Sequence, residues 1–118
     1  MNFDFSEDQK MLKEQASKFL SDNCSLDVAR DILESDKCYS EEVWHGLVEL
    51  GLTGTAIPEE YGGLGLGALE LCVVAEELGR AAAPVPFSSS VYLGTEAIVK
   101  YGTNSQKEKW LQQAQGFN

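Results

Sequence analysis

Residues 57–72 read IPEEYGGLGLGALELC and place a cluster of glycines directly before an apolar run. Within it, residues 63–68 match G-x-G-x-x-A, the fingerprint of a dinucleotide-binding turn, which requires flanking parallel strands. The segment after the apolar run is rich in proline and not strand-like, and Glu59 and Glu60 would repel a phosphate. The glycines therefore indicate a joint, in which positive φ angles and close backbone approach turn the chain sharply into a helix.

The run after the joint, Ala68–Leu78, reads ALELCVVAEEL and carries only three charged residues. Such a helix has an apolar surface over most of its circumference, so we expect other parts of the protein to cover it. It is the predicted central helix of the fold. Gly79 is its predicted end, since glycine commonly terminates helices.

Three helices are predicted before the joint. Ser6 and Gln9 have the spacing of a capping box, and the helical pattern behind them extends to about Asn23. A second, short helix begins near Ser25 or Asp27. The third opens at Ser40, with two glutamates in its first turn, where carboxylates favour the positive end of the helix dipole.

Two more helices are predicted after the proline-rich segment. One covers Ser88 to Lys100, and the other starts at Thr103 or Asn104 and ends near Gly116. The stretch Thr53–Ile57 resembles a strand but is too short and isolated to build a sheet. The predicted fold class is therefore all-α, a bundle of five to six mostly antiparallel helices in one domain of 118 residues.

The charge distribution excludes several classes of partner. The formal net charge is −10, and the segment between Lys37 and Arg80 contains eight carboxylates and no basic residue. Nucleic-acid binding requires clustered lysine and arginine, and so does binding to an anionic membrane surface. We therefore expect no nucleic-acid partner and no membrane partner.

The cysteines, the first residues and the longest apolar run indicate the cellular compartment of the protein. Cys24, Cys38 and Cys72 form no CxxC pair, and with one histidine in the chain they predict no metal site. The start, MNFDFSEDQK, lacks the basic and apolar regions of a signal peptide, and the longest apolar run, Leu71 to Ala75, is too short to span a membrane. We expect a soluble, cytoplasmic protein.

The joint also carries a family resemblance. The sequence from Gly51 to Gly67, GLTGTAIPEEYGGLGLG, followed by EELGR at 76–80, resembles the amino-terminal domain of the acyl-CoA dehydrogenases. The opening FDFSEDQKMLKEQASKFL is similar to the first helix of that domain, and YGTNSQKEKWL is similar to its sixth. The resemblance covers nearly the whole chain.

The resemblance implies an oxidoreductase that removes hydrogens from the α and β carbons of an acyl-CoA thioester, a step of fatty acid metabolism. In that family a glutamate takes the α proton and FAD takes the β hydride. The flavin-binding β-domain and the carboxy-terminal bundle, which holds the catalytic base, have no counterpart in residues 1–118. We therefore expect no catalytic residue and no bound FAD in this chain alone, and no activity from it.

The same resemblance implies where an acyl chain would lie. In the family, the start of the fifth helix and the loop before it line the cavity for the fatty chain, and the matching stretch here is VPFSSSVYL at 85–93. The predicted substrate-binding residues are Val85, Pro86, Ser89, Ser90 and Leu93. Packing between helices by small residues is the alternative role for each of them.

Two functions stay open on the sequence. In the first, the chain is the substrate-side domain of an acyl-CoA dehydrogenase, with acyl-CoA and the missing domains as its partners. In the second, it is a free-standing helical module without catalysis that pairs with a flavoprotein subunit or with itself. A homodimer through exposed apolar helix faces belongs to this second reading.

Overall fold

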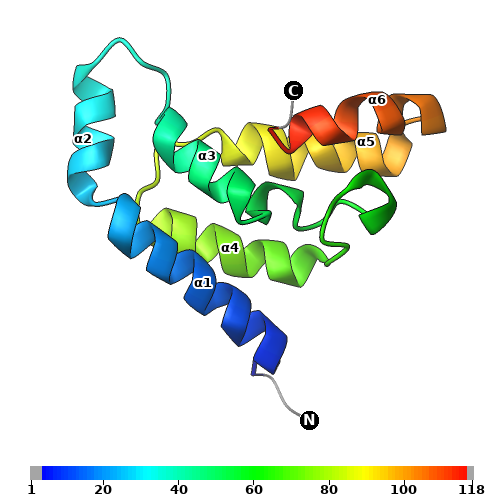
Figure 1. Ribbon diagram of the computed structural model, residues 1–118, viewed down its shortest axis with the longest axis horizontal. Coiled ribbons are helices and arrows are strands. Elements are labelled where there is room, and N and C mark those ends of the chain that lie inside the picture. The colour runs from blue at the N-terminus through cyan, green and yellow to red at the C-terminus, as the bar shows by residue number, and fades with distance from the viewer. Residues whose placement is uncertain (1–3, 117–118) are drawn as a thin grey trace.

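The computed structural model of the protein describes residues 4–116, and the regular elements in that range are all helices (Figure 1). They confirm the all-α prediction. In chain order they are α1 (Glu7–Asn23), α2 (Leu26–Glu34), α3 (Glu41–Glu49), the 3₁₀ turns η1 (Leu52–Gly54) and η2 (Glu59–Tyr61), α4 (Ala68–Arg80), the π-helix η3 (Ser88–Thr95), α5 (Glu96–Tyr101) and α6 (Asn104–Ala114).

The helix starts follow from local hydrogen bonds that the sequence predicts. The Ser6 hydroxyl accepts from the Gln9 amide at 3.2 Å, and the Ser6 amide donates to the Gln9 side chain at 2.9 Å. Thr103 and Gln106 repeat this reciprocal pair at the start of α6. Ser40 caps α3 through its hydroxyl. Each cap satisfies an amide that the first helical turn leaves without a partner.

The glycine-rich joint is closed by its own backbone. Four consecutive amides donate to carbonyls of the preceding turn: Gly63 to Pro58, Leu64 to Gly54, Gly65 to Ile57 and Leu66 to Thr55, at 2.9–3.2 Å. A Cβ atom at Gly63 would overlap the carbonyl oxygen and the Cβ of Ile57, so only glycine fits there. The segment Thr53–Ile57 is therefore paired with the loop in turns and is not a strand.

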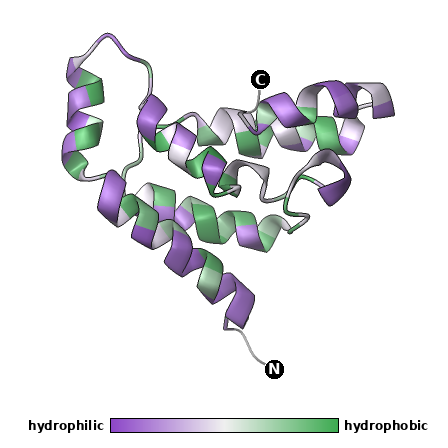
Figure 2. Cartoon of the chain, viewed as in Figure 1, coloured by the Kyte–Doolittle hydropathy of each residue, from purple (hydrophilic) through white to green (hydrophobic). Residues whose placement is uncertain are grey.

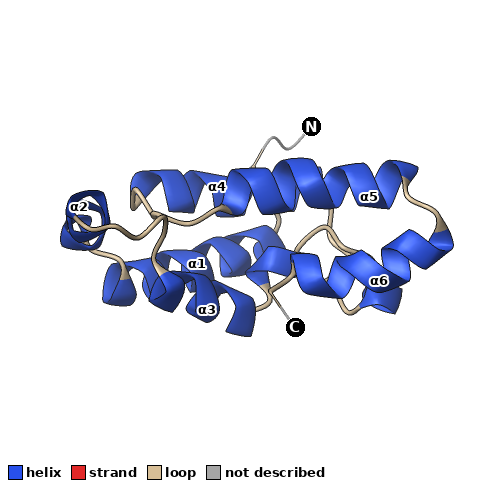
Figure 3. Ribbon diagram, turned by 90° about the horizontal axis from the view of Figure 1, so that it is seen from above, coloured by secondary structure: helices blue, strands red, loops and turns tan. Residues whose placement is uncertain are grey.

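The helices form two layers. Seen from above, α4 and α5 lie in one layer, and α1, α3 and α6 lie in the other (Figure 3). The Cα extents are 42 × 41 × 19 Å, so the molecule is a slab. Between the layers lies a core of fully covered side chains that include Leu47, Val74 and Leu52. The most extensive packing joins α1 to α4.

Two predictions about α4 are wrong. Helix α4 does not end at Gly79 but continues to Arg80, and the left-handed turn falls on Ala82, with φ +50°. The helix predicted from Ser88 to Lys100 is present, as the π-helix η3 followed directly by α5. The circumference of α4 is covered on one side only: Leu71, Val73, Val74, Glu77 and Leu78 are buried, whereas Ala68, Leu69 and Cys72 are exposed.

Helix α2 stands apart from the two layers. Figure 3 shows it end-on, whereas α4 and α5 lie lengthwise. No residue of α2 is buried, although Val28 packs against the core. Leu26 and Leu33 are 58% and 84% exposed, and both apolar and polar residues are visible along this helix in Figure 2. Nine residues are too few for a stable helix in water without packing.

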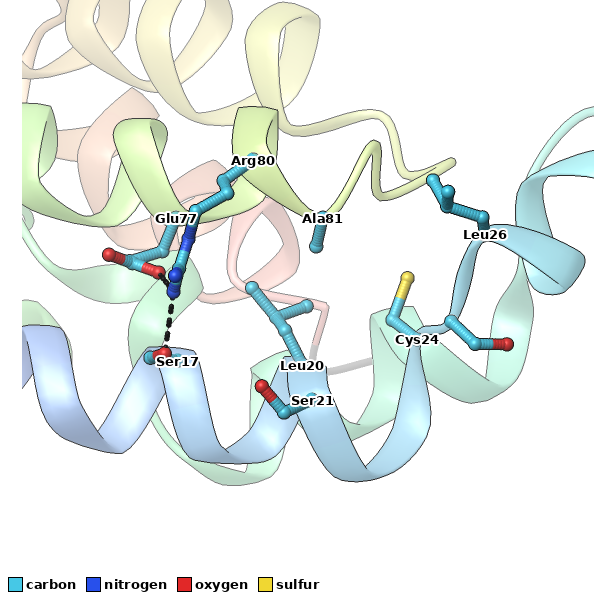
Figure 4. Close-up of a pocket in the computed structure, with 9 residues that line it drawn as sticks. Ser17, Leu20, Ser21, Cys24, Leu26, Glu77, Arg80 and Ala81 are labelled. Carbon is cyan, nitrogen blue, oxygen red and sulfur yellow. Dashed lines mark hydrogen bonds and ion pairs between the residues drawn. The ribbon is translucent and has the colours of Figure 1, made fainter.

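Removal of the Arg80 side chain should destabilise the fold, because it leaves a buried carboxylate without its cation. Glu77 is only 2% exposed and pairs with Arg80, which also donates to the Ser17 hydroxyl at 2.6 Å and so joins α4 to α1 (Figure 4). We expect Arg80→Ala to lower the unfolding free energy by about 2 kcal/mol, since a buried charge loses its partner. Urea unfolding measures the change.

The matched control is Arg30→Ala, because Arg30 pairs with Asp27 at the same i, i+3 spacing but in the open. Exposed pairs contribute little, so this variant should change the unfolding free energy by about 0.5 kcal/mol or less. Equal losses in the two variants would contradict the role assigned to Glu77.

Candidate functional site

The loop after α4 is fixed at several points before the π-helix begins. The Ala83 amide donates to the Leu78 carbonyl at 3.0 Å, and the Ser40 amide donates to the Pro84 carbonyl at 2.8 Å. Phe87 is 3% exposed and anchors the end of the loop in the core. These contacts set the direction in which the following helix leaves the loop.

The π-helix η3 continues from this anchor. Its wide turn is held partly by side chains: the Thr95 hydroxyl donates to the Ser90 carbonyl at 2.6 Å, five residues back. Thr95 is 2% exposed, so its hydroxyl has this internal partner in place of water. Short π-helical segments are frequent at functional sites of proteins. This stretch contains three of the predicted substrate-binding residues.

The structure places the five predicted substrate-binding residues in different surroundings. Val85 is half-buried and packs against the core. Pro86 is half-buried, and its carbonyl accepts from the Ser90 amide at 3.2 Å. Ser89 and Leu93 are exposed, and Leu93 exposes 69% of its surface. The Ser90 hydroxyl donates to the Ala114 carbonyl at 3.3 Å, which is a packing role toward α6.

These placements separate the five residues into two groups. Ser89 and Leu93 lie four residues apart, almost one π-helical turn, so they share the outer surface of η3. Val85 and Ser90 contribute to the interior of the domain. Contact with a substrate stays a prediction for all five, and the outer pair is the better placed to touch a bound molecule.

A cleft that the sequence did not predict lies between α4 and α5. It has a volume of about 550 Å³ and a mostly apolar wall. Its lining residues include Ala68, Leu71, Cys72, Ala75, Tyr92 and Val99. The Glu96–Lys100 ion pair, at 3.1 Å, lies at its edge. Helical spacing of Tyr92, Glu96 and Val99 was the available signal for a shared face.

Tyr92 lines this cleft, and its surroundings raise the pKa of its phenol. Its ring packs edge-on against Phe87, with the ring centres 5.2 Å apart, and Phe87 in turn packs edge-on against Trp44. Burial raises the pKa of the Tyr92 phenol to about 12, and the nearby Cys72 adds to the rise. The phenol is therefore a neutral hydrogen-bonding group at physiological pH, and the cleft is suited to holding apolar groups.

The folded protein should lose stability between pH 10 and pH 12 through Tyr92. In this range the unfolded chain releases the phenol proton at its ordinary pKa of 10.0, whereas the folded chain keeps it to about 12. The unfolded state then binds fewer protons, so the unfolding free energy falls as the pH rises. Since Tyr92 is only half-buried, we expect a loss of about 1–2 kcal/mol.

Urea unfolding at several pH values measures the loss of unfolding free energy. Tyrosine absorbance at 295 nm measures the titration of the phenol in the folded protein. Tyr92→Phe is the control and should flatten the dependence on pH over this range. A Tyr92 phenol that titrates near pH 10 in the folded protein would contradict the assignment.

The glycine-rich joint does not fit the pyrophosphate of a flavin or nicotinamide cofactor. A phosphate loop needs free amides, but the amides of residues 63–66 already donate to backbone carbonyls. Glu59 lies against Gly65 and places a carboxylate beside the loop. In residues 4–116, no three side chains of His, Cys, Asp or Glu are grouped as metal ligands.

Within residues 4–116, no helix combines the length and the apolar character needed to cross a bilayer.

The chain matches known proteins along almost its full length. Residues 6–116 match the family profile described as "Acyl-CoA dehydrogenase, N-terminal domain". The mitochondrial isovaleryl-CoA dehydrogenase of Arabidopsis thaliana is 38% identical over 111 residues, which cover 91% of this chain. The acryloyl-CoA reductase (NADH) of Anaerotignum propionicum is 34% identical over 112 residues, or 94% of this chain.

A solved structure has the same arrangement of helices. A chain in the ChsE4–ChsE5 complex from Mycobacterium tuberculosis superposes with a TM-score of 0.88 at 27% identity, over 98% of this chain and 32% of that one. This chain likewise spans only 27% of the Arabidopsis protein and 28% of the Anaerotignum protein. The match is therefore confined to one domain of each longer protein.

Proposed function

This chain belongs to the acyl-CoA dehydrogenase family as an amino-terminal domain, and we propose that it forms the acyl-pocket side of an FAD-dependent acyl-CoA dehydrogenase. The complete enzyme removes hydrogens from the α and β carbons of an acyl-CoA thioester. The relative from Arabidopsis, named an isovaleryl-CoA dehydrogenase, supports this activity. The base and the flavin site come from the parts of the enzyme that this chain does not match, so the isolated chain is inactive and holds no FAD.

The observation that carries the proposal is the surface left uncovered by this chain. The structure exposes 7600 Å², whereas a compact monomer of 12.9 kDa exposes about 6300 Å². The excess of about 1300 Å² exceeds the area that one partner usually buries in a protein interface, about 800 Å². The outer surface of η3, where Ser89 and Leu93 are exposed, is part of this exposed area. The rest of the enzyme covers this surface.

Within the complete enzyme, η3 contributes one wall of the acyl cavity. Ser89 and Leu93 face the fatty chain, and Val85, Pro86 and Ser90 hold the wall in position. The small side chain at Ser89 leaves room for a long or branched acyl group. We place the protein in the cytoplasm, and recovery of the native protein in a mitochondrial fraction would contradict that location.

A chimera tests the proposed function directly. Residues 6–116 replace the matching segment of the Arabidopsis isovaleryl-CoA dehydrogenase, and the purified protein is assayed for bound flavin and for reduction of a dye by acyl-CoA substrates. We expect a yellow protein that oxidises an acyl-CoA. The Arabidopsis protein without this segment is the control. A folded, flavin-loaded chimera that oxidises no acyl-CoA would refute the proposal.

In the same chimera, Ser89→Phe should shorten the acyl cavity. We expect kcat/KM for the longest accepted acyl-CoA to fall about tenfold or more, with a smaller effect on the shortest one, since a tenfold change needs only about 1.4 kcal/mol of lost binding. Ser105→Phe, at an exposed position of α6, is the matched control. An equal change for all chain lengths would contradict the position of Ser89.

A second candidate function is a free-standing module without catalysis, paired with a flavoprotein subunit or with a second copy of itself. The uncovered surface favours pairing of either kind. The solved relative is a chain in a structure described as the ChsE4–ChsE5 complex, so a chain with this arrangement of helices occurs there in an assembly. An isolated chain that binds no flavin and forms a stable complex in its source cells would support this function over the first.

A further inference from the structure

The π-helix η3 has a side-chain hydrogen bond that matches its register. The Thr95 hydroxyl donates to the Ser90 carbonyl, five residues back, at 2.6 Å. In an α-helix a threonine hydroxyl reaches a carbonyl three or four residues back, whereas a π-helical turn closes over five residues. This hydrogen bond therefore belongs to the π-helical register of residues 88–95. Thr95 is 2% exposed, so water does not compete for its hydroxyl.

Two neighbouring residues support the same register. At Gly94, an added Cβ atom would lie 3.0 Å from the Ser89 carbonyl oxygen, so the turn brings that carbonyl close to a residue without a side chain. The Ser90 hydroxyl donates to the Ala114 carbonyl at 3.3 Å and ties the turn to α6. The carbonyl that Thr95 binds is therefore itself held in place.

The register determines where Leu93 points. Leu93 is 69% exposed, and it lies between the start of the π-helix, which the buried Phe87 anchors, and the Gly94–Thr95 pair. An α-helix completes a turn in fewer residues than a π-helix does. A return of residues 88–95 to the α-helical register would thus rotate Leu93 about the helix axis relative to Phe87. The outer surface of η3 would then present a different side chain at that position.

We propose that Thr95 is a positioning residue for the acyl wall, which fixes the direction of Leu93 through the Ser90 carbonyl and so favours long acyl groups over short ones. Thr95 is buried and does not touch the acyl group itself. In the π-helical register Leu93 contacts the far part of a long acyl chain, which a short chain does not reach. The inference rests on the proposed function, because it assigns a specificity role within the same wall.

Thr95→Val in the chimera tests the inference, since valine keeps the shape of threonine and removes only the hydroxyl. We expect KM for the longest accepted acyl-CoA to rise about fivefold or more, with kcat within about twofold, because the lost apolar contact is shared by bound substrate and transition state. KM for the shortest substrate should change by less than about twofold. Thr95→Ser keeps the hydroxyl and should restore the native values.

The matched control is Thr55→Val. Thr55 is fully buried, and its hydroxyl donates to the Leu52 carbonyl at 2.6 Å, so this variant loses a buried hydrogen bond of the same kind in the glycine-rich joint. It should leave the ratio of the two KM values unchanged. An equal change of that ratio in both variants would reduce Thr95 to a general structural role and overturn the inference.

A double variant tests whether Thr95 acts through Leu93. In a Leu93→Ala background the side chain that Thr95 positions is gone, so Thr95→Val should change KM for the longest substrate by less than about twofold. If Thr95→Val has its full effect in this background, Thr95 acts on the substrate by another route, which overturns the inference.

A crystal structure of the 118-residue chain with Thr95→Val gives a readout that does not depend on activity. We expect α-helical hydrogen bonds across residues 88–95 and a rotated Leu93. An unchanged π-helix with Leu93 in its native direction would overturn the inference even if the chimera is active. A flavin-loaded chimera without activity would instead refute the proposed function and with it the effect on substrate choice, while the register change would still be seen in the crystal.

Discussion

Gly63→Ala should lower the unfolding free energy by about 3 kcal/mol, one of the two largest effects expected for a single substitution in this protein. The added Cβ would overlap the carbonyl oxygen and the Cβ of Ile57. Both are part of a buried residue, so neither can move freely away. The backbone of the joint has to open, and the hydrogen bonds of residues 63–66 to the preceding turn are weakened together.

The measurement is urea unfolding followed by tryptophan fluorescence, with Gly79→Ala as the control. Gly79 lies inside α4, and a Cβ there would meet no atom within 4 Å. Alanine is a better helix former, so the control should raise the unfolding free energy by about 0.5–1 kcal/mol. A change in the unfolding free energy of less than about 0.5 kcal/mol for Gly63→Ala would contradict the close approach of Gly63 to Ile57.

Leu111→Ala should cost about 3 kcal/mol and should loosen α6 in particular. Leu111 is fully buried and is the one buried residue recorded within α6. Its replacement leaves a cavity between α6 and the rest of the slab, and Leu→Ala changes at such sites cost about 2–5 kcal/mol. The next anchor is Gln115, which accepts from Thr53 through its carbonyl at 2.8 Å and donates to Tyr61 through its side chain at 3.1 Å.

Hydrogen exchange distinguishes local opening of α6 from unfolding of the whole protein in the Leu111→Ala variant. Because α6 has one buried anchor inside its length, its amides should exchange faster by a larger factor than those of α1 or α4. Gln113→Ala, at an exposed position two residues away, is the control and should change neither stability nor exchange by a measurable amount. Uniform acceleration across all helices would show that α6 does not open separately.

The helix starts could be predicted from the sequence because their causes are local. The capping box of Ser6 and Gln9 and the cap at Ser40 need only residues within four positions of one another. The π-helical turn at Ser88–Thr95 could not be predicted in this way. It depends on the Thr95 hydroxyl reaching the Ser90 carbonyl in a buried setting, and spacing of apolar residues does not report the hydrogen-bond register.

The end of α4 was mispredicted for a related reason. A glycine can end a helix, but at Gly79 the chain remains helical, and the left-handed conformation falls on Ala82 instead. The position of that turn is set by tertiary contacts of the following loop, such as the bond from the Ser40 amide to the Pro84 carbonyl. These contacts join segments more than forty residues apart in the sequence.

The candidate site also combines features that the sequence predicted with features that depend on tertiary contacts. The family resemblance implied a site in the segment from Val85 to Leu93, but it could not separate the exposed Ser89 from its neighbour Ser90, which is bonded to α6. That difference arises from how α6 folds back over η3. The cleft beside Tyr92 was missed because its two walls come from helices that are adjacent only in the folded protein.

The closed joint limits how this domain can change during evolution. A glycine-rich turn before a helix is a common starting point for a nucleotide site, and residues 63–68 already match its sequence pattern. Here a mutation that added a nearby lysine would gain nothing, because the amides that should meet a phosphate are engaged with Gly54, Thr55, Ile57 and Pro58. Several substitutions would have to open the turn first, each at a loss of stability. The loop whose sequence suggests a nucleotide site is therefore a poor starting point for one.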